Sequence, residues 1–146
     1  MRLSTKGRYA VMAMADLARR QAESAERAVS LSDIAARQEI SLSYLEQLFA
    51  RLRRRGLVQS HRGPGGGYRL ARSAVETNIA EIVLAVDEPL RATRCEAQTP
   101  GCMLNGERCL THDLWEETGR QIEAWLASVS LDDVIAGRVG ARKAAA

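Results

Sequence analysis

The stretch from Ser30 to Gly56 holds two helix starts in close succession, and this pattern restricts the fold more than any other. Ser30 opens a Ser-x-x-Asp capping box, which predicts a short helix to about Gln38. Ser41 can cap a second helix, whose apolar residues recur along one face until Gly56 ends it. Two short helices joined by the tight connection 39–40 form a helix-turn-helix. The apolar face of the second helix consists of Leu45, Leu48, Phe49 and Leu52.

A glycine-rich hairpin is predicted directly after these helices. The segments 57–60 and 68–70 alternate like short strands, and His61-Arg62-Gly-Pro-Gly-Gly-Gly67 separates them. A hairpin after a recognition helix is the wing of a winged helix, and its glycines let the backbone lie against a groove wall. Arg62 at the tip is well placed for a narrow minor groove. A nucleotide-binding loop is the alternative, but the stretch lacks a Gly-Lys-Ser/Thr ending and no helix follows it.

The second helix of the pair turns polar and basic residues outward. A recognition helix reaches base edges in the major groove with residues near its N-terminus. Gln47 can pair bidentately with adenine, and hydroxyls such as that of Ser43 tolerate several bases. The same face could be plain solvent surface, but the hairpin that follows favours DNA binding. The outward residues are Ser43, Tyr44, Gln47, Arg51 and Arg54.

Positive charge is concentrated in the first half of the chain. Residues 1–72 carry 14 Lys and Arg against 6 Asp and Glu, whereas residues 73–146 carry 7 against 12. A basic half indicates a polyanionic partner, most simply nucleic acid, and the acidic half would be repelled from it. Arg2 and Lys6 are candidates for phosphate contacts, with a solvated basic start as the alternative.

Further helices complete a mainly α-helical prediction, which suits a chain with 46% apolar residues and only six aromatic ones. An amphipathic run predicts a first helix from Tyr9 to Arg20, and the polar residues 21–29 predict a loop. Asn78 with Glu81 caps a helix that should pack under the winged helix before Pro89 ends the segment.

A long amphipathic helix is predicted from Leu114 to Val129, with both tryptophans on or near its apolar stripe. The stripe is too extended for a small domain to bury alone, and exposed apolar surface of this kind marks an interface. We therefore expect homodimerisation through this helix, with folding back on its own domain as the alternative. Ser130 predicts the cap of a last short helix, and 141–146 a frayed tail.

Three cysteines and one histidine are predicted to converge in the second half. Cys95, Cys102 and Cys109 are separated by two gaps of six residues, and the Pro, Gly and Asn residues in these gaps let the backbone turn back. The segment after Cys109 reads as helical, which places His112 one turn away on the same face. Thiolates and an imidazole can form a metal cage, and long gaps favour a labile iron-sulfur cluster.

Spacing alone leaves further roles for the three cysteines open. A structural Cys3His zinc site is the strongest rival, although zinc sites usually pair their cysteines more closely. Redox-active thiols remain a further alternative. A disulfide fits poorly, because the cysteine count is odd and no secretory signal is visible. No apolar run is long enough to cross a bilayer, so we expect a cytoplasmic protein with no membrane partner. A Cys-His hydrolase lacks an obvious orienting partner.

Five motifs, taken in order, resemble the IscR-type iron-sulfur cluster regulators, a family of winged helix-turn-helix transcription regulators. The likeness covers about residues 1–135, and the order of the five motifs is more specific than any one of them. The motifs are the opening Met-Arg-Leu-Ser-Thr-Lys-Gly-Arg-Tyr-Ala, the run Ile40–Phe49, Arg62–Tyr68, Ala85–Glu88 and Cys109-Leu-Thr-His112.

The resemblance implies a dimeric transcription factor, not an enzyme, that binds a [2Fe-2S] cluster and represses cluster-assembly genes when the cluster is present. It implies cluster donation by the assembly machinery and a double-stranded DNA operator. DNA would be contacted by Arg62 of the wing and by four residues of the recognition helix, Ser41, Ser43, Tyr44 and Gln47. Glu46 would be a selectivity residue. The cluster ligands would be Cys95, Cys102, Cys109 and His112.

One departure from the family pattern leaves the cluster type open. Both cysteine gaps are one residue longer than in the pattern. Related regulators of nitric oxide or iron status also use three cysteines in this loop, and some of them hold a [4Fe-4S] cluster. A zinc-stabilised interaction module or small thiol enzyme that never touches DNA is the rival from another class.

The expected fold is mainly α with a small β-hairpin, a winged helix-turn-helix followed by a long C-terminal dimerisation helix. The expected organisation is a DNA-binding domain at 1–88, a cluster-binding loop at 89–112, the dimerisation helix and short terminal helix at 113–136, and a flexible tail at 137–146.

Overall fold

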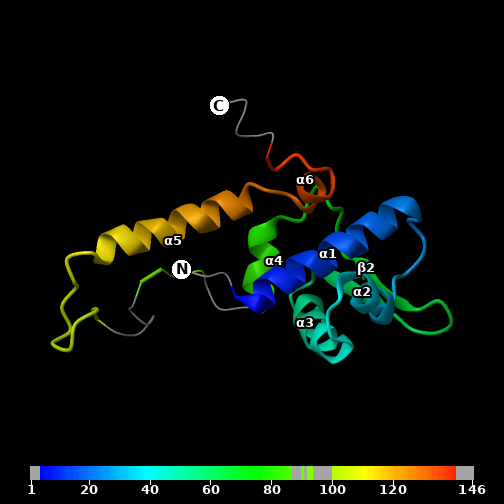
Figure 1. Cartoon of the computed structure of the whole chain (residues 1–146), viewed down its shortest axis with the longest axis horizontal. Coiled ribbons are helices and arrows are strands. Elements are labelled where there is room, and N and C mark those ends of the chain that lie inside the picture. The colour runs from blue at the N-terminus through cyan, green and yellow to red at the C-terminus, as the bar shows by residue number, and fades with distance from the viewer. Residues whose placement is uncertain (1–3, 87–89, 91, 94–99, 141–146) are drawn as a thin grey trace.

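The computed structural model describes residues 4–86, 90, 92–93 and 100–140. This part of the chain is mainly helical and carries one two-stranded antiparallel hairpin, as the sequence predicts (Figure 1). The elements in chain order are α1 (Thr5–Glu23), α2 (Leu31–Gln38), α3 (Leu42–Arg54), β1 (Val58–His61), β2 (Gly67–Leu70), α4 (Ile79–Val86), α5 (His112–Ala127) and α6 (Leu131–Ile135).

Side-chain caps at the predicted positions begin most of the helices. The hydroxyl of Ser30 accepts a hydrogen bond from the backbone N–H of Asp33 at 3.2 Å, so α2 begins where the sequence predicts. Asn78 and Glu81 each accept from the other's backbone N–H, at 3.0 and 3.2 Å, a reciprocal box at the start of α4. The same box between Ser130 and Asp133 starts α6.

The hairpin is held against the loop that precedes α2. Strands β1 and β2 pair in a register that sets Val58 opposite Leu70 and His61 opposite Gly67. Tyr68 exchanges two backbone hydrogen bonds with Val29, at 2.8 and 2.9 Å. A Cβ on Gly67 would lie 2.2 Å from the carbonyl oxygen of Val29, so only glycine permits this close approach.

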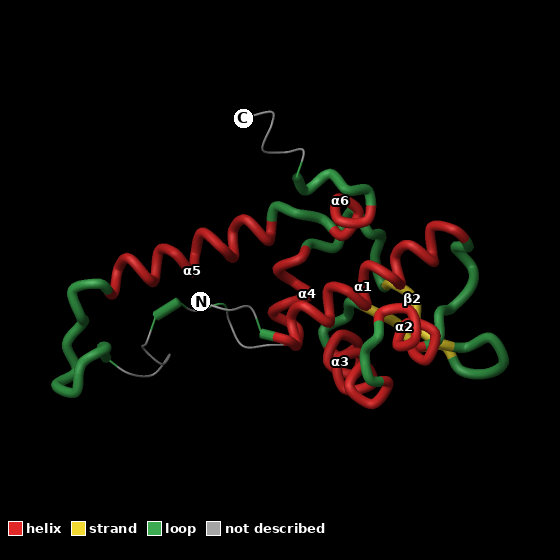
Figure 2. Tube along the Cα trace, in the orientation of Figure 1, coloured by secondary structure: helices red, strands yellow, loops and turns green. Residues whose placement is uncertain are grey.

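The hydrophobic core lies between α1, α3, α4 and the hairpin (Figure 2). Helix α1 runs through the middle of this body and packs against α2, α3, α4, α6 and β2. The Phe49 ring of α3 meets the Tyr68 ring of β2 edge-on, with the ring centroids 5.0 Å apart. The largest fully buried side chains include Met14, Leu17, Ile34, Leu45, Phe49, Leu52, Ile82, Val83 and Leu131.

Helix α5 extends away from this body, and the loop that carries Cys102 and Cys109 lies at its far end (Figure 1). Its C-terminal part packs against α4. The side chains of Leu114, Trp115 and Trp125 are 58%, 43% and 53% exposed, so much of the predicted apolar stripe is uncovered in the single chain. In the described part of the chain, no helix is long and apolar enough to traverse a bilayer.

Two helices have ends that differ from the sequence prediction. Helix α1 begins at Thr5, where Ser4 caps it through the N–H of Gly7, and it continues to Glu23, so it extends beyond the Tyr9–Arg20 run at both ends. Helix α5 ends at Ala127, so Val129 lies beyond it and is buried in the core. The Pro89 boundary and the tail 141–146 lie outside the described residues.

Candidate nucleic-acid interface and metal centre

The first turns of α3 present the predicted DNA-contact residues together. Ser41, Ser43, Glu46 and Gln47 are exposed, whereas Tyr44 is half-buried. The Tyr44 ring meets the Tyr9 ring of α1 edge-on at 5.9 Å, which fixes its position beside the exposed turn. Ser41 also caps α3 through the N–H of Tyr44, and its hydroxyl lies 3.0 Å from that of Ser43.

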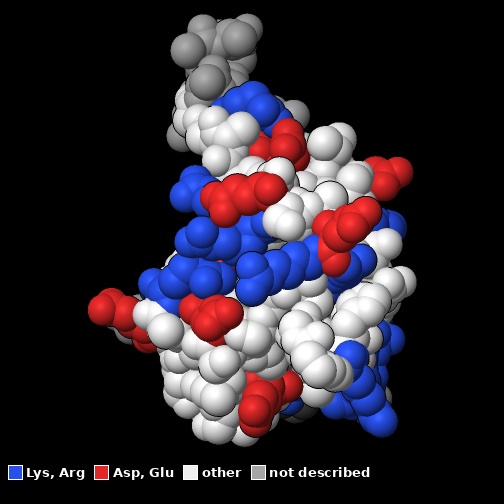
Figure 3. All heavy atoms as spheres, turned by 90° about the vertical axis from the view of Figure 1, so that its right-hand side faces the viewer, with Lys and Arg blue, Asp and Glu red and all other residues white. Residues whose placement is uncertain are grey.

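Basic side chains gather at the hairpin end of the molecule. Arg62 follows β1 directly in the hairpin loop and is exposed. Lys6 is also exposed, but on the first turn of α1, which lies away from the hairpin loop (Figure 1). Figure 3 views the hairpin end and shows Lys and Arg side chains in a band across its middle. Arg27 and Arg69 line a shallow pocket beside Arg62. Arg2 lies outside the described residues.

An ion pair that the sequence did not reveal joins α1 to α2. Asp16, with 4% of its side chain exposed, accepts hydrogen bonds from Arg37 Nε and Nη2 and from Gln38 Nε2, at distances between 2.7 and 3.2 Å. Burial acts to raise the pKa of the Asp16 carboxyl, but the hydrogen bonds and charge of Arg37 outweigh it and lower the pKa. The only sequence signal was a single acid inside the apolar run of α1.

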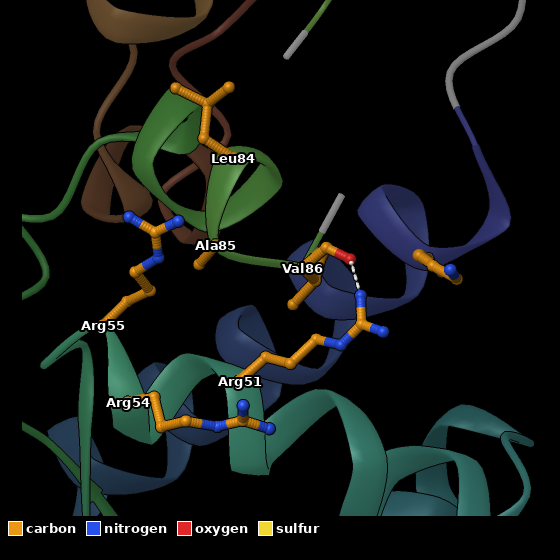
Figure 4. Close-up of a pocket in the computed structure, with 7 residues that line it drawn as sticks. Arg51, Arg54, Arg55, Leu84, Ala85 and Val86 are labelled. Atoms are coloured by element: carbon orange, nitrogen blue, oxygen red, sulfur yellow. Dashed lines mark hydrogen bonds between the residues drawn. The ribbon is translucent and has the colours of Figure 1, made fainter. Parts of the chain in front are cut away.

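A second unforeseen contact links α3 to α4. Arg51, predicted as part of the outward face of α3, donates a hydrogen bond from Nη1 to the backbone oxygen of Val86 at 2.7 Å (Figure 4). Val86 is the last residue of α4, so the bond satisfies one of the carbonyls that a helix leaves unpaired at its end. The recognition helix is thereby attached to the element that precedes the cysteine loop.

The structure brings two of the predicted metal ligands together. Sγ of Cys102 lies 3.0 Å from Nδ1 of His112, the first residue of α5. The other ring nitrogen, Nε2, lies 3.8 Å from a carboxylate oxygen of Glu116, and the His112 side chain is 9% exposed. A carboxylate behind a ligand histidine orients the ring towards a metal. Glu116 would fill this place behind His112 if His112 binds a metal; sequence reasoning missed it, although its spacing of four residues from His112 was visible.

The other two predicted cysteine ligands are Cys109 and Cys95. Cys109 lies in a turn before α5, which begins at His112 and not directly after Cys109 as predicted, and its Sγ lies 3.7 Å from Oγ1 of Thr111. Its backbone oxygen accepts from the N–H of His112 at 3.1 Å. Cys95 lies outside the described residues.

Tight turns shape the described part of the loop. The N–H of Met103 donates to the Glu107 oxygen at 3.0 Å, and Gly106 has a φ of 84°. A Cβ on Gly101 would lie 2.3 Å from the Gly106 oxygen. The chain thus turns back between Cys102 and Cys109 as the glycines predict. Two half-buried thiols, one of them beside an imidazole, are donor types that fit an iron-sulfur cluster and also zinc.

Comparisons with known proteins identify relatives over most of the chain. The profile of the Rrf2 family, described as an iron-dependent transcriptional regulator, matches residues 3–137. The chain is 54% identical over 135 residues to the HTH-type transcriptional regulator IscR of Photorhabdus laumondii subsp. laumondii, which covers 92% of this chain and 79% of that protein. It is 54% identical to a putative HTH-type transcriptional regulator, ORF2, of Azotobacter vinelandii, covering 93% and 80% of the two chains.

Solved structures also match the chain over most of its length. The structure of T. potens IscR matches with a TM-score of 0.75 and 36% identity, covering 97% of this chain and 90% of that one. CymR, the global cysteine regulator of B. subtilis, matches with a TM-score of 0.75 and 30% identity, covering 93% and 97%.

Proposed function

Because the chain belongs to the Rrf2 family of transcriptional regulators and is of the IscR type, we propose that it senses iron-sulfur clusters and represses cluster-assembly genes when a [2Fe-2S] cluster is bound. The contact between Cys102 and His112 carries this proposal, because it brings a thiol and an imidazole, both common ligands of iron and zinc, to one point of the loop. The protein acts as a transcription regulator and not as an enzyme.

The proposed ligands are Cys95, Cys102, Cys109 and His112. The loop would exist in a cluster-bound and a cluster-free form, and the availability of iron and sulfide would set the balance between the two. The chain's own contribution is to hold His112 nearly buried with Glu116 behind it, which keeps Nδ1 directed at the sulfur of Cys102. We expect the cluster to come from the assembly machinery in the cytoplasm.

The proposed DNA interface consists of the exposed start of α3 and the wing. Ser41, Ser43, Tyr44, Glu46 and Gln47 would reach base edges, and Arg62 a neighbouring minor groove. Arg2 and Lys6 would contact phosphates. The side chains in the structure's described ranges are exposed or half-buried, as this role requires.

The apolar stripe of α5 supports the proposal of a homodimer. Leu114 and Trp125 are eleven residues apart, which sets them about 20° apart around the helix on one uncovered face. Two-fold pairing of this face would separate two recognition helices, so operator half-sites would be about one duplex turn, or a multiple of it, apart. A double substitution, Leu114→Lys with Trp125→Lys, would make the protein monomeric in sedimentation equilibrium, whereas Glu117→Lys would not.

Glu46 is the proposed selectivity residue. It is exposed on the DNA-facing side of α3, where a carboxylate repels phosphate and accepts a hydrogen bond only from a base such as cytosine. A cluster-dependent change in operator choice requires different DNA affinities in the two states of the protein. Glu46→Ala should therefore reduce the difference in operator binding between cluster-loaded and cluster-free protein. An undiminished difference would remove Glu46 from the mechanism.

The proposed organisation follows from these roles. Residues 1–88 form the DNA-binding domain, 89–112 the cluster loop, 113–136 the dimerisation helix with the short terminal helix, and 137–146 a tail. Residues 87–89, most of 91–99 and the last six residues fall outside the structure's described ranges.

Two measurements test the function as a whole. Protein purified without oxygen should show a visible spectrum of an iron-sulfur cluster, with iron and acid-labile sulfide, and the amount of iron per chain, read together with the spectrum, distinguishes [2Fe-2S] from [4Fe-4S]. A colourless, zinc-loaded sample would contradict cluster sensing. A gel shift with promoter DNA should weaken steeply with salt, because a basic surface releases counterions on binding.

A further inference from the structure

We infer that a basic pocket at the C-terminal end of α3 holds a backbone phosphate of the operator. The pocket has a volume of about 510 Å³ and lies where α1, α3 and α4 meet (Figure 4). Four cations line it, together with the last residues of α4: Lys6, Arg51, Arg54 and Arg55, with Leu84, Ala85 and Val86. The inference rests on the proposed DNA binding and adds a contact far along α3 from the predicted base-reading residues.

The described lining of the pocket carries only positive charge. No carboxylate is among the described residues that line it, and within the described ranges none of its four cations forms an ion pair. Arg51 is held by the Val86 oxygen, and Arg54 donates a long hydrogen bond of 3.4 Å from Nε to Ala50. Like charges that converge on one hollow attract an anion from solution.

The position of the pocket relates it to the DNA-reading turn. Arg54 follows Ser43 by eleven residues, which is close to three full helical turns, so both lie on nearly the same face of α3 and about 16 Å apart along the axis. The major groove is about 12 Å wide. A helix whose first turn meets base edges therefore brings its other end to the sugar-phosphate strand that borders the groove.

The chemistry of the pocket fits that strand. Guanidinium and ammonium groups bind phosphate oxygens with short, charge-assisted hydrogen bonds. Lys6 comes from α1 and Arg54 from α3, so one phosphate between them would fix the angle of the recognition helix in the groove. Contacts of this kind set the register of a protein on DNA and carry no sequence information themselves.

The test compares two double variants that lose equal charge from the same two helices. Lys6→Gln with Arg54→Gln removes two cations of the pocket, and Arg19→Gln with Arg53→Gln removes two exposed cations outside it. Affinities for an operator duplex and an unrelated duplex are measured over a salt series, with urea unfolding to confirm that each variant is folded. Arg54→Lys serves as the charge-preserving variant.

Loss of one phosphate contact reduces the steepness of the plot of log affinity against log salt by about 0.9. At about 0.1 M salt this corresponds to a roughly eightfold loss of affinity. We expect the pocket variant to show this loss equally on both duplexes, and the matched control and Arg54→Lys to retain the wild-type slope. Equal losses in both double variants, an unchanged slope in the pocket variant, or a loss confined to the operator would each overturn the phosphate site. If the wild-type protein itself bound neither duplex, the proposed function would fail instead.

Discussion

Replacing Asp16 by Asn should destabilise the helix-turn-helix measurably, because the carboxylate joins α1 to α2. Truncating one partner of a buried ion pair costs about 3–5 kcal/mol in general. The Arg37 side chain is 30% exposed, so water can solvate it after the loss, and we expect about 2–3 kcal/mol here. For a chain of this length, this corresponds to a fall in Tm of roughly 5–10 °C. Urea unfolding followed by circular dichroism measures the loss.

The pH dependence of this loss identifies its cause. The pKa of Asp16 is lowered in the folded state, so its stabilisation is present above the unfolded value of about 3.9 and fades as the pH falls through the folded value. The stability difference between wild type and Asp16→Asn should stay constant from neutral pH downwards and shrink only in acid below that unfolded value.

The exposed pair of Arg20 and Glu23 provides the control. Its side chains are 42% and 60% exposed, so Arg20→Gln should cost less than about 0.5 kcal/mol. Equal stability of Asp16→Asn and wild type at neutral pH would refute the reasoning. A stability difference that persisted unchanged into strong acid would show that packing, and not charge, is responsible.

Three further predictions concern local contacts, each read by urea unfolding. Gly67→Ala should cost more than about 2 kcal/mol because its Cβ would meet the Val29 backbone, whereas Gly65→Ala, with a φ of 73° and open space, should cost about 1 kcal/mol. Ser130→Ala removes one half of a reciprocal cap and should cost about 1 kcal/mol, more than Ser41→Ala, whose cap bond measures 3.4 Å. Arg51→Gln should cost about 1 kcal/mol through the lost bond to Val86, and Arg55→Gln almost nothing; equal losses would assign no role to that bond.

The features that the sequence predicted well depend on neighbouring residues. The caps at Ser30, Asn78 and Ser130 each join groups three residues apart, so the pattern alone specifies them. The hairpin was equally visible, because its glycines mark positions that other residues cannot occupy. Helix ends were predicted less well. The first and last residues of α1 are mostly polar, so the spacing of apolar residues does not mark where this helix begins and ends.

Contacts between distant segments were not predictable in the same way. Asp16 and Arg37 are 21 residues apart, and Arg51 and Val86 are 35 apart, so both bonds depend on how finished helices pack. The sequence analysis predicted neither the burial of Asp16 in the apolar run of α1 nor its partner. For the cysteine loop, spacing predicted that Cys102 and His112 would meet, while the position of Cys109 before α5 depends on where that helix begins.

The arrangement of the helices restricts how the proposed sensor could reach the DNA. The cysteine loop lies at the far end of α5 from α3 (Figure 1), and a helix of 16 residues is about 24 Å long. Coupling over such a distance needs packed elements that respond to both sites. Helix α4 contacts both α5 and α3, and the Arg51 bond attaches its last residue directly to the recognition helix. We therefore propose that, within one chain, a shift of α5 would reach α3 through α4, and that a second copy bound to the uncovered stripe of α5 would cause that shift.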